Sequence, residues 1–165
     1  MAWPIPNPRH KAILVAKGFT QIEGIDYTDT FSPVVKMTIV RVFMAIVASQ
    51  NWPLFQFDVN TAFLHGDLNE EVYMKAPPGL PLDRPDLVCK LQRSLYGLKQ
   101  ASRQWNYKLT ETLASTGYIQ SKADYSLFTK GILVYVGDLV LGGTYINEIN
   151  HLKALLDSKF SIKDL

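Results

Sequence analysis

Two apolar segments far apart in the sequence each carry an aspartate where the apolar run breaks off. Residues 54–59 alternate in polarity with a period of two, as a half-buried strand does, and Asp58 lies near the end of this run. Residues 132–141 form an apolar run interrupted by Gly137 and Asp138, a pair suited to the tight turn of a hairpin. We therefore expect two strands that carry carboxylates at a strand end and at a hairpin tip.

Hydrophobic periodicity along the rest of the chain predicts three helices among short strands. Apolar residues recur every three or four positions in the helices, with Thr38 as the N-cap of the first and Gly117 closing the second. The expected helices cover 38–47, 102–115 and 146–156, and the further strands cover 12–15, 72–74, 88–91, 125–128 and 132–135. Glycine and proline indicate loops at 23–33 and 76–81. This order predicts an α+β fold, an antiparallel sheet with helices packed on one face.

The composition is that of a folded domain. Of 165 residues, 47% are hydrophobic, and the formal net charge is +2, which neither requires nor excludes a polyanionic partner. The apolar runs are too short to cross a bilayer, so no membrane partner is expected. Residues 1–10 are rich in proline and are expected to be a disordered leader, so that the folded unit covers 11–165.

Cysteine and histidine usage argues against a disulfide framework and a zinc site. Cys89 is the single cysteine, so no intrachain disulfide can form, and we expect an intracellular, reducing location, either cytoplasmic or nuclear. The three histidines lie far apart and do not pair with Cys89 at ligand spacing. The oligomeric state is not legible from the sequence.

Asp58 and Asp138 can approach a shared cation if their two strands are neighbours in one sheet. Carboxylate oxygens are preferred ligands of Mg²⁺, which keeps waters and takes phosphate oxygens as its remaining ligands. Two such ions can activate an attacking hydroxyl and stabilise a leaving pyrophosphate, although bridging both ions normally takes more than two carboxylates. The alternative is that both residues are ordinary turn aspartates, because Asp favours turn conformations.

Six motifs, in order along the chain, resemble the reverse transcriptase of copia-type LTR retrotransposons. They lie at 11–21 (KAILVAKGFTQ), 27–35 (YTDTFSPVV), 57–68 (FDVNTAFLHGDL), 77–79 (PPG), 95–101 (LYGLKQA) and 124–128 (DYSLF). The likeness extends over residues 11–165, nearly the whole chain. Several long motifs in one order are far more specific than any one of them alone.

The resemblance implies a polymerase palm with partial fingers and RNA-directed DNA polymerase activity, a nucleotidyltransferase reaction of transposable elements. The partners would be an RNA template, a DNA primer and a dNTP, and the cofactor would be Mg²⁺ in a two-metal site. Asp58 resembles the first metal-binding aspartate of the family, and Asp138 resembles the second member of its Asp-Asp pair. Both are therefore expected to be catalytic and to bind metal.

The same resemblance assigns nucleotide binding to Phe63, Gly97, Lys99 and Lys11. Phe63 resembles the aromatic residue beneath the incoming sugar, or else is a plain core aromatic. Lys99 and Gly97 lie in a stretch that resembles the nucleotide-binding loop. There the ammonium of Lys99 could bind a phosphate, and Gly97 could let that ligand approach the backbone closely. Without the family context, Lys99 could equally be a solvated lysine and Gly97 a turn glycine. Lys11 opens the first motif.

Four features depart from the family pattern. Gly137 stands where the first aspartate of the pair is expected, so the turn can form while a metal ligand is lost. Ile13 stands in place of an arginine whose guanidinium would hold the triphosphate. The connection over 128–132 is shorter than the family's, and the chain ends at Leu165, before the region that holds the primer in relatives. Together these features predict a catalytically defective, fragmentary domain.

Two other interpretations remain open. The chain could be a residual polymerase that needs Mn²⁺ or a partner to supply missing parts. It could instead be a noncatalytic nucleic-acid-binding remnant, because basic side chains are interleaved with Tyr96 and Trp105 in a pattern suited to phosphate contacts and base stacking. The basic side chains are Lys90, Arg93, Lys99, Arg103 and Lys108. An ordinary solvated helix face would show the same pattern.

Overall fold

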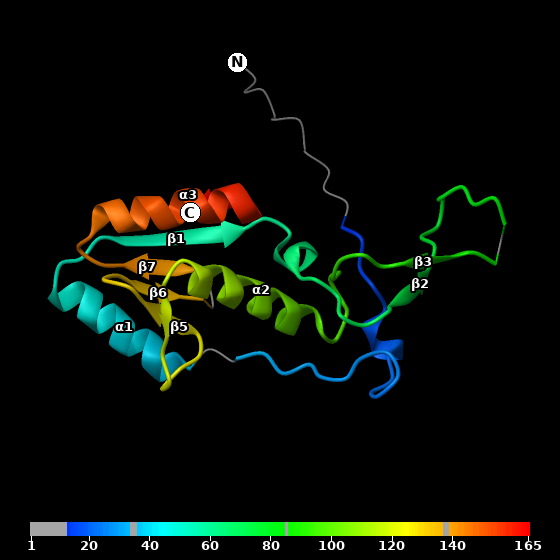
Figure 1. The fold of residues 1–165 in the computed structure, drawn as a ribbon, viewed down its shortest axis with the longest axis horizontal. Helices are drawn as coiled ribbons and strands as arrows, with labels where there is room; N and C mark the ends of the chain where they lie inside the picture. The colour runs from blue at the N-terminus through cyan, green and yellow to red at the C-terminus, as the bar shows by residue number, and fades with distance from the viewer. Residues whose placement is uncertain (1–12, 34–35, 85, 137–138) are drawn as a thin grey trace, which may run out of the picture.

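The main body of the protein is a six-stranded antiparallel sheet with the strand order β4-β5-β6-β7-β1-β8 (Figure 1). The structure is a computed structural model that describes residues 13–33, 36–84, 86–136 and 139–165. The strands of this sheet are β1 (Leu54–Val59), β4 (Ile119–Gln120), β5 (Leu127–Thr129), β6 (Leu133–Tyr135), β7 (Val140–Gly142) and β8 (Ile162–Asp164). The helices are α1 (Met37–Ser49), α2 (Ala101–Ser115) and α3 (Ile146–Phe160), with short 3-10 helices η1 (Gly18–Thr20) and η2 (Ala62–His65).

Strand β1 joins the two parts of the sheet, because it pairs with β7 along one edge and with β8 along the other. Phe57 is only 2% exposed, whereas Asp58 is exposed and lies opposite Lys163 of β8. This alternation is the period-two pattern of a strand with one buried face. The strand predicted at 54–59 is therefore confirmed at both of its ends.

Strands β6 and β7 form the hairpin that was predicted over 132–141. Their register pairs Tyr135 with Val140 and continues to the ends of both strands. Leu139, just before β7, has a φ of +45°, a left-handed conformation that is uncommon outside glycine. Gly137 and Asp138, the expected tip, lie outside the described residues.

Helices cover both faces of the sheet, so the prediction that they pack on one face is wrong. Helices α2 and α3 bury one face together with the strand residues Phe57, Phe128, Val134 and Leu141. The neighbouring residues along the same strands belong to a different cluster with Phe43 and Val47 of α1; they are Leu127, Leu133, Tyr135 and Val140. Figure 1 shows α1 and α3 on opposite sides of the strands. Strands β5, β6 and β7 carry apolar residues at consecutive positions, so each of these strands has an apolar side chain on both faces of the sheet. Both faces must therefore be covered by helices.

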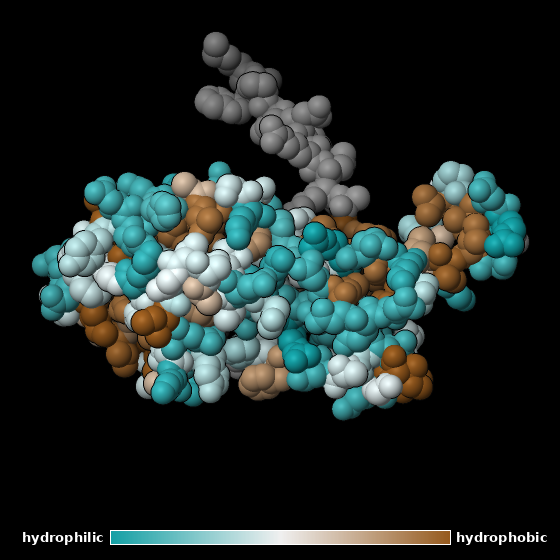
Figure 2. All heavy atoms as spheres, viewed as in Figure 1, coloured by the Kyte–Doolittle hydropathy of each residue, from teal (hydrophilic) through white to brown (hydrophobic). Residues whose placement is uncertain are grey.

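A two-stranded ribbon, β2 (Tyr73–Lys75) with β3 (Val88–Lys90), projects from this body (Figure 1). A second, smaller core at its base gathers Ala16, Val72, Leu95, Leu98 and Ala101. Figure 2 shows apolar side chains on the lobe formed by the ribbon and its proline-rich loop. The strands predicted at 72–74 and 88–91 are confirmed to within one residue, and the loop at 76–81 is confirmed.

Other expectations differ from the structure at the ends of elements. Thr38 lies inside α1, and Lys36 occupies the N-cap position without a side-chain hydrogen bond. Of the strand expected at 12–15, the described residues show only an isolated bridge between Val15 and Tyr96. Strands β4 and β8 were not expected, because segments of two and three residues are too short to show a period. Within the described ranges, no helix is both long and apolar enough to cross a membrane.

A charged cluster fastens the β5–β6 turn to the start of α3. Nζ of Lys130 lies 3.0 Å from Oε1 of Glu148, and the hydroxyl of Tyr118 donates to the same oxygen at 3.1 Å. The Lys130 ammonium also lies 5.4 Å from the centroid of the Tyr118 ring. The hydrogen bond from Lys130 holds the pKa of Glu148 below its ordinary value, and burial raises the pKa of Tyr118.

We predict that this cluster makes the stability depend on pH on the acid side. Because the pKa of Glu148 is lowered by folding, its stabilising effect is complete above the ordinary pKa of 4.5 and is lost as the pH falls below that value. Glu148→Gln should therefore flatten the acid limb of a plot of unfolding free energy against pH. Urea unfolding of both proteins across the acid range measures this, and parallel acid limbs would contradict it.

We predict that Phe128 anchors the core beneath α2 and α3. It is 0% exposed, so Phe128→Ala should lower the free energy of unfolding by about 3–5 kcal/mol. Phe19 in η1 is 80% exposed, so the matched change Phe19→Ala should shift that free energy by no more than about 0.5 kcal/mol. Equilibrium urea denaturation compares the two, and equal losses would show that the core is misassigned.

Candidate functional site

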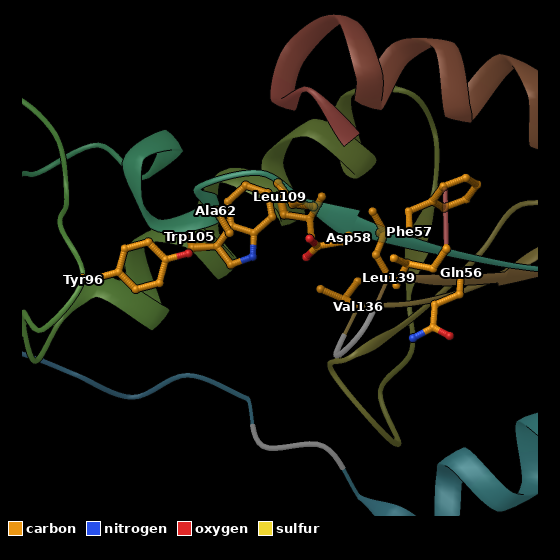
Figure 3. A pocket seen from close by; sticks show the side chains of 11 residues that line it. Gln56, Phe57, Asp58, Ala62, Tyr96, Trp105, Leu109, Val136 and Leu139 are labelled. Carbon is orange, nitrogen blue, oxygen red and sulfur yellow. The ribbon is translucent and has the colours of Figure 1, made fainter. Parts of the chain in front are cut away.

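A pocket of about 210 Å³ opens where β1 meets α2 and the β6–β7 hairpin. Figure 3 shows the side chain of Asp58 between Trp105 on one side and Val136 on the other. Ala62, Tyr96 and Leu139 also contribute to the walls of the pocket. Among the described residues that line the pocket, Asp58 is the acidic one, so a cation bound here would meet its carboxylate.

The carboxylate of Asp58 is available to a ligand. Asp58 is exposed, and its side chain forms no hydrogen bond or ion pair with any residue that the structure describes. An ionised carboxylate only accepts hydrogen bonds, and its oxygens are suitable ligands for a hard cation such as Mg²⁺. Within the described residues no three acidic, histidine or cysteine side chains gather as a metal site.

The pairing of β1 brings the end of the hairpin beside Asp58. The backbone amide of Phe57 donates to the carbonyl oxygen of Leu139 at 3.1 Å. Leu139 and Val136, which flank the expected tip, both line the pocket that contains Asp58. Three of the predicted site residues, Gly137, Asp138 and Lys11, lie outside the described residues. Their assigned roles therefore stay predictions.

The turn after β1 is held in an uncommon conformation. Thr61 has a φ of +51°, in the left-handed region that β-branched residues rarely adopt. The side-chain amide of Asn60 donates to the carbonyl oxygen of Ser161 at 3.0 Å, and Nε2 of His65 lies 3.2 Å from the carbonyl oxygen of Asn60. These contacts hold the turn that carries Ala62 into the pocket wall.

Phe63 lies behind the pocket wall. Its ring meets the ring of Tyr96 edge-on, with centroids 4.7 Å apart, and its half-buried side chain packs on the second core. Tyr96 itself lines the pocket. Phe63 thus lies behind a residue that lines the same pocket as Asp58. The structure also gives Phe63 the packing contacts expected of a core aromatic, so both interpretations of this residue keep a basis.

Lys99 is joined to the N-terminal segment. Its Nζ donates to the carbonyl oxygen of Gln21 at 3.3 Å and to the hydroxyl of Tyr27 at 3.4 Å. Its backbone amide donates to Oε1 of Gln21 at 2.9 Å. Lys99 is not among the pocket-lining residues. The contacts to Gln21 and Tyr27 occupy two of the three donors of the Lys99 ammonium.

Gly97 and Gly18 let two backbone segments cross at close range. Gly97 has a φ of +91°, and a Cβ on it would overlap the carbonyl oxygen of Ala16. A Cβ on Gly18 would overlap the carbonyl oxygen of Gly97. The amide of Ala16 donates to the carbonyl of Tyr96 at 2.7 Å in the same crossing. In this structure the group that comes close to Gly97, and that requires a glycine there, is the backbone carbonyl of Ala16.

Gln100 is a polar residue of this region that the sequence analysis did not single out. It is 0% exposed, and its side chain donates to the carbonyl oxygen of Asp26 at 3.3 Å and accepts from Nε2 of Gln21 at 3.1 Å. A buried amide satisfied at both ends fixes the loop that carries Tyr96. Gln21 and Gln100 both lie in motifs that resemble the family, and this was the signal in the sequence that could have identified them. Glutamine is usually exposed, so nothing in the sequence indicated a buried side chain at Gln100.

The basic side chains proposed as a phosphate-binding surface are mostly engaged with carboxylates. Ion pairs join Lys90 to Glu71, Arg93 and Lys108 to Asp67, and Arg103 to Asp29. Trp105, expected to offer a stacking face, packs edge-on against Phe160 at a centroid distance of 5.0 Å. These contacts favour the interpretation as an ordinary charged surface over a dedicated nucleic-acid surface.

Residues 5–165 match the family model for reverse transcriptase (RNA-dependent DNA polymerase). The chain is 44% identical over 164 residues to the retrovirus-related Pol polyprotein from transposon RE2 of Arabidopsis thaliana, a match that covers 94% of this chain and 11% of that protein. No solved structure matches this chain.

Two further relatives give the same result. The Pol polyprotein from transposon RE1 of Arabidopsis thaliana is 45% identical, over 94% of this chain and 11% of its own length. The Pol polyprotein from transposon TNT 1-94 of Nicotiana tabacum is 44% identical, over 95% of this chain and 12% of its own length. The chain therefore spans only 11–12% of these relatives.

We predict that Gly97 is required for the backbone crossing. Gly79 has a similar φ of +88° but open space where a Cβ would lie. Both Gly97→Ala and Gly79→Ala incur the left-handed penalty of about 1–2 kcal/mol. Gly97→Ala should cost about 1–3 kcal/mol more, because it also forces two backbones apart. Urea denaturation of both variants tests this, and equal losses would mean that the segments do not cross so closely.

Proposed function

This chain belongs to the reverse transcriptase (RNA-dependent DNA polymerase) family, and we propose that it is a polymerase domain that extends a DNA primer with dNTPs on an RNA template. The resemblance to copia-type elements is confirmed by the Pol polyproteins that match nearly its whole length. In this proposal the six-stranded sheet with α2 and α3 is the palm. The ribbon β2–β3 and the segment before α1 are the partial fingers.

The observation that carries the proposal is the hydrogen bond from the Phe57 amide to the Leu139 carbonyl oxygen, 3.1 Å long. It joins the residue before Asp58 to the residue after Asp138, the two positions that the family resemblance assigns to metal binding. The exposed carboxylate of Asp58 has no partner within the described residues, as a ligand-binding group requires. A turn aspartate engaged with its own backbone would lack this availability.

The residues near Asp58 fit a Mg²⁺ site in part. Asp58 provides an exposed oxygen ligand, and Asp138 is proposed as the second. When bound, Mg²⁺ supplies a Lewis acid that activates the primer hydroxyl and offsets charge on the reacting phosphate. Trp105 and Leu109 supply the apolar wall next to Asp58, and Tyr96 supplies an aromatic wall that Phe63 supports from behind.

We further propose that the metal site is impaired, because Gly137 occupies the position where the family resemblance places another aspartate. Glycine has no side-chain carboxylate to offer as a ligand, and the carboxylate of Asp58 cannot take the place of a second bridging ligand. Glycine is also compatible with a tight hairpin turn, so the loss affects the chemistry while the hairpin survives. Residual activity with Mn²⁺ is the alternative outcome.

We predict that Gly137→Asp restores primer extension. On an RNA template with Mg²⁺, the variant should extend a DNA primer at least about a hundredfold faster than the unchanged chain, since one electrostatic group in an active site is commonly worth that much. Single-nucleotide extension on a denaturing gel measures the rate. Extension by the unchanged chain at the rate of the variant would contradict the proposed impairment.

Two further arms and a folding control complete this experiment. Asp58→Asn in the Gly137→Asp background should abolish extension, which tests the role of Asp58 itself. The unchanged chain with Mn²⁺ in place of Mg²⁺ tests the residual polymerase. A Gly137→Asp chain that is folded by circular dichroism yet inactive would show that the missing carboxylate is not what limits activity.

A further inference from the structure

Asp58 and Lys163 stand directly opposite each other in the β1–β8 pair. Residues opposed in an antiparallel pair carry their side chains on the same face, with Cβ atoms about 4.5–5.5 Å apart. Both residues are exposed. The topology therefore places an ammonium-bearing side chain beside the carboxylate proposed to bind metal, although 105 positions separate them in the sequence.

The residues on the other face of the β1–β8 pair show the direction in which the side chains of Asp58 and Lys163 point. Phe57 and Asp164 are also opposed, and Phe57 is buried beneath α3. Lys153 of α3 forms an ion pair with Asp164 and lies 5.5 Å from the Phe57 ring centroid. Because side chains alternate along each strand, Asp58 and Lys163 lie together on the face turned away from α3.

The register of β8 is held from both of its ends. The side-chain amide of Asn60 donates to the carbonyl of Ser161 at 3.0 Å, and the amide of Leu165 donates to the carbonyl of Gln56 at 3.1 Å. Between these two hydrogen bonds, Ile162 packs on the core beneath α2 and α3. Lys163 is therefore fixed opposite Asp58, because a slip of one residue would turn Ile162 out of the core.

Neither charge is neutralised within the described part of the chain. No ion pair or side-chain hydrogen bond joins Lys163 or Asp58 to another described residue, whereas Lys153 and Asp164 pair on the opposite face. We propose that Lys163 is a fixed positive charge that weakens the binding of a free divalent cation at Asp58. This inference rests on the proposed function, because it takes Asp58 as a metal ligand.

The expected size of the effect follows from Coulomb's law. A unit charge about 7 Å from a divalent ion in a water-like dielectric, screened by 0.1 M salt, changes the affinity about threefold, and more at low salt. A cation that arrives with phosphate oxygens brings negative charge of its own and meets a smaller penalty. The site would then discriminate against the bare ion and accept the ion together with a polyphosphate.

The test is a titration of Mn²⁺ alone into the ¹⁵N-labelled chain, followed by paramagnetic broadening of the Asp58 and Val59 amide signals. Lys163→Gln should bind Mn²⁺ about threefold more tightly than the unchanged chain, and the gain should shrink as salt is raised. Lys163→Arg keeps the charge and should leave the affinity unchanged. Lys122→Gln, in the loop after β4 at the far edge of the sheet, removes the same net charge and should also leave it unchanged.

The outcomes separate this inference from the proposed function. If Asp58→Asn does not weaken Mn²⁺ binding, or no protein binds Mn²⁺ at these signals, Asp58 is not a metal ligand and the proposed function fails. If Asp58→Asn abolishes binding but Lys163→Gln matches the unchanged chain, only the role of Lys163 is overturned. Equal gains in Lys163→Gln and Lys122→Gln would also overturn it, because the effect would then come from net charge alone.

Discussion

The antiparallel pairing of β1 with β7 is the constraint on which the rest of the arrangement depends. It places Phe57 under α3, directs Asp58 to the opposite face, and brings Leu139 at the end of the β6–β7 hairpin against the strand that carries Asp58. Because side chains alternate along a strand, a shift of one residue would bury Asp58 and expose Phe57. The buried area of the core therefore also fixes the position of the candidate site.

A second constraint holds the wall of the pocket that faces β1. The N-terminal segment crosses the loop before α2 at Gly18 and Gly97, and the buried side chain of Gln100, at the start of α2, bonds to Gln21 and Asp26 of the N-terminal segment. Tyr96 lies at the crossing and lines the pocket. Backbone packing thus determines the orientation of an aromatic wall, and two of the family-like motifs meet through structural contacts rather than through a ligand.

The sequence predicted the elements whose pattern is long or regular, and it missed those that depend on pairing. The alternation of residues 54–59 and the helical spacing of α2 and α3 were sufficient to predict these elements. Strands β4 and β8 are only two and three residues long, and they are recognised as strands only by their pairing with neighbouring strands. Asp58 was identified from its position in a strand. Lys163 could not be, because only the register of β8 reveals that it faces Asp58.

The measurement that most directly tests the account is disulfide trapping of the β1–β7 register. Opposed residues in an antiparallel pair have Cα atoms about 4.5–5.5 Å apart, a separation that a disulfide spans. In a Cys89→Ser background, Gln56→Cys with Val140→Cys, which are partners in the structure, should form an intrachain disulfide under mild oxidation. The shifted pair Phe55→Cys with Val140→Cys should not, because its side chains lie on opposite faces. Preferential cross-linking of the shifted pair would contradict the register and, with it, the placement of Asp58 beside the hairpin.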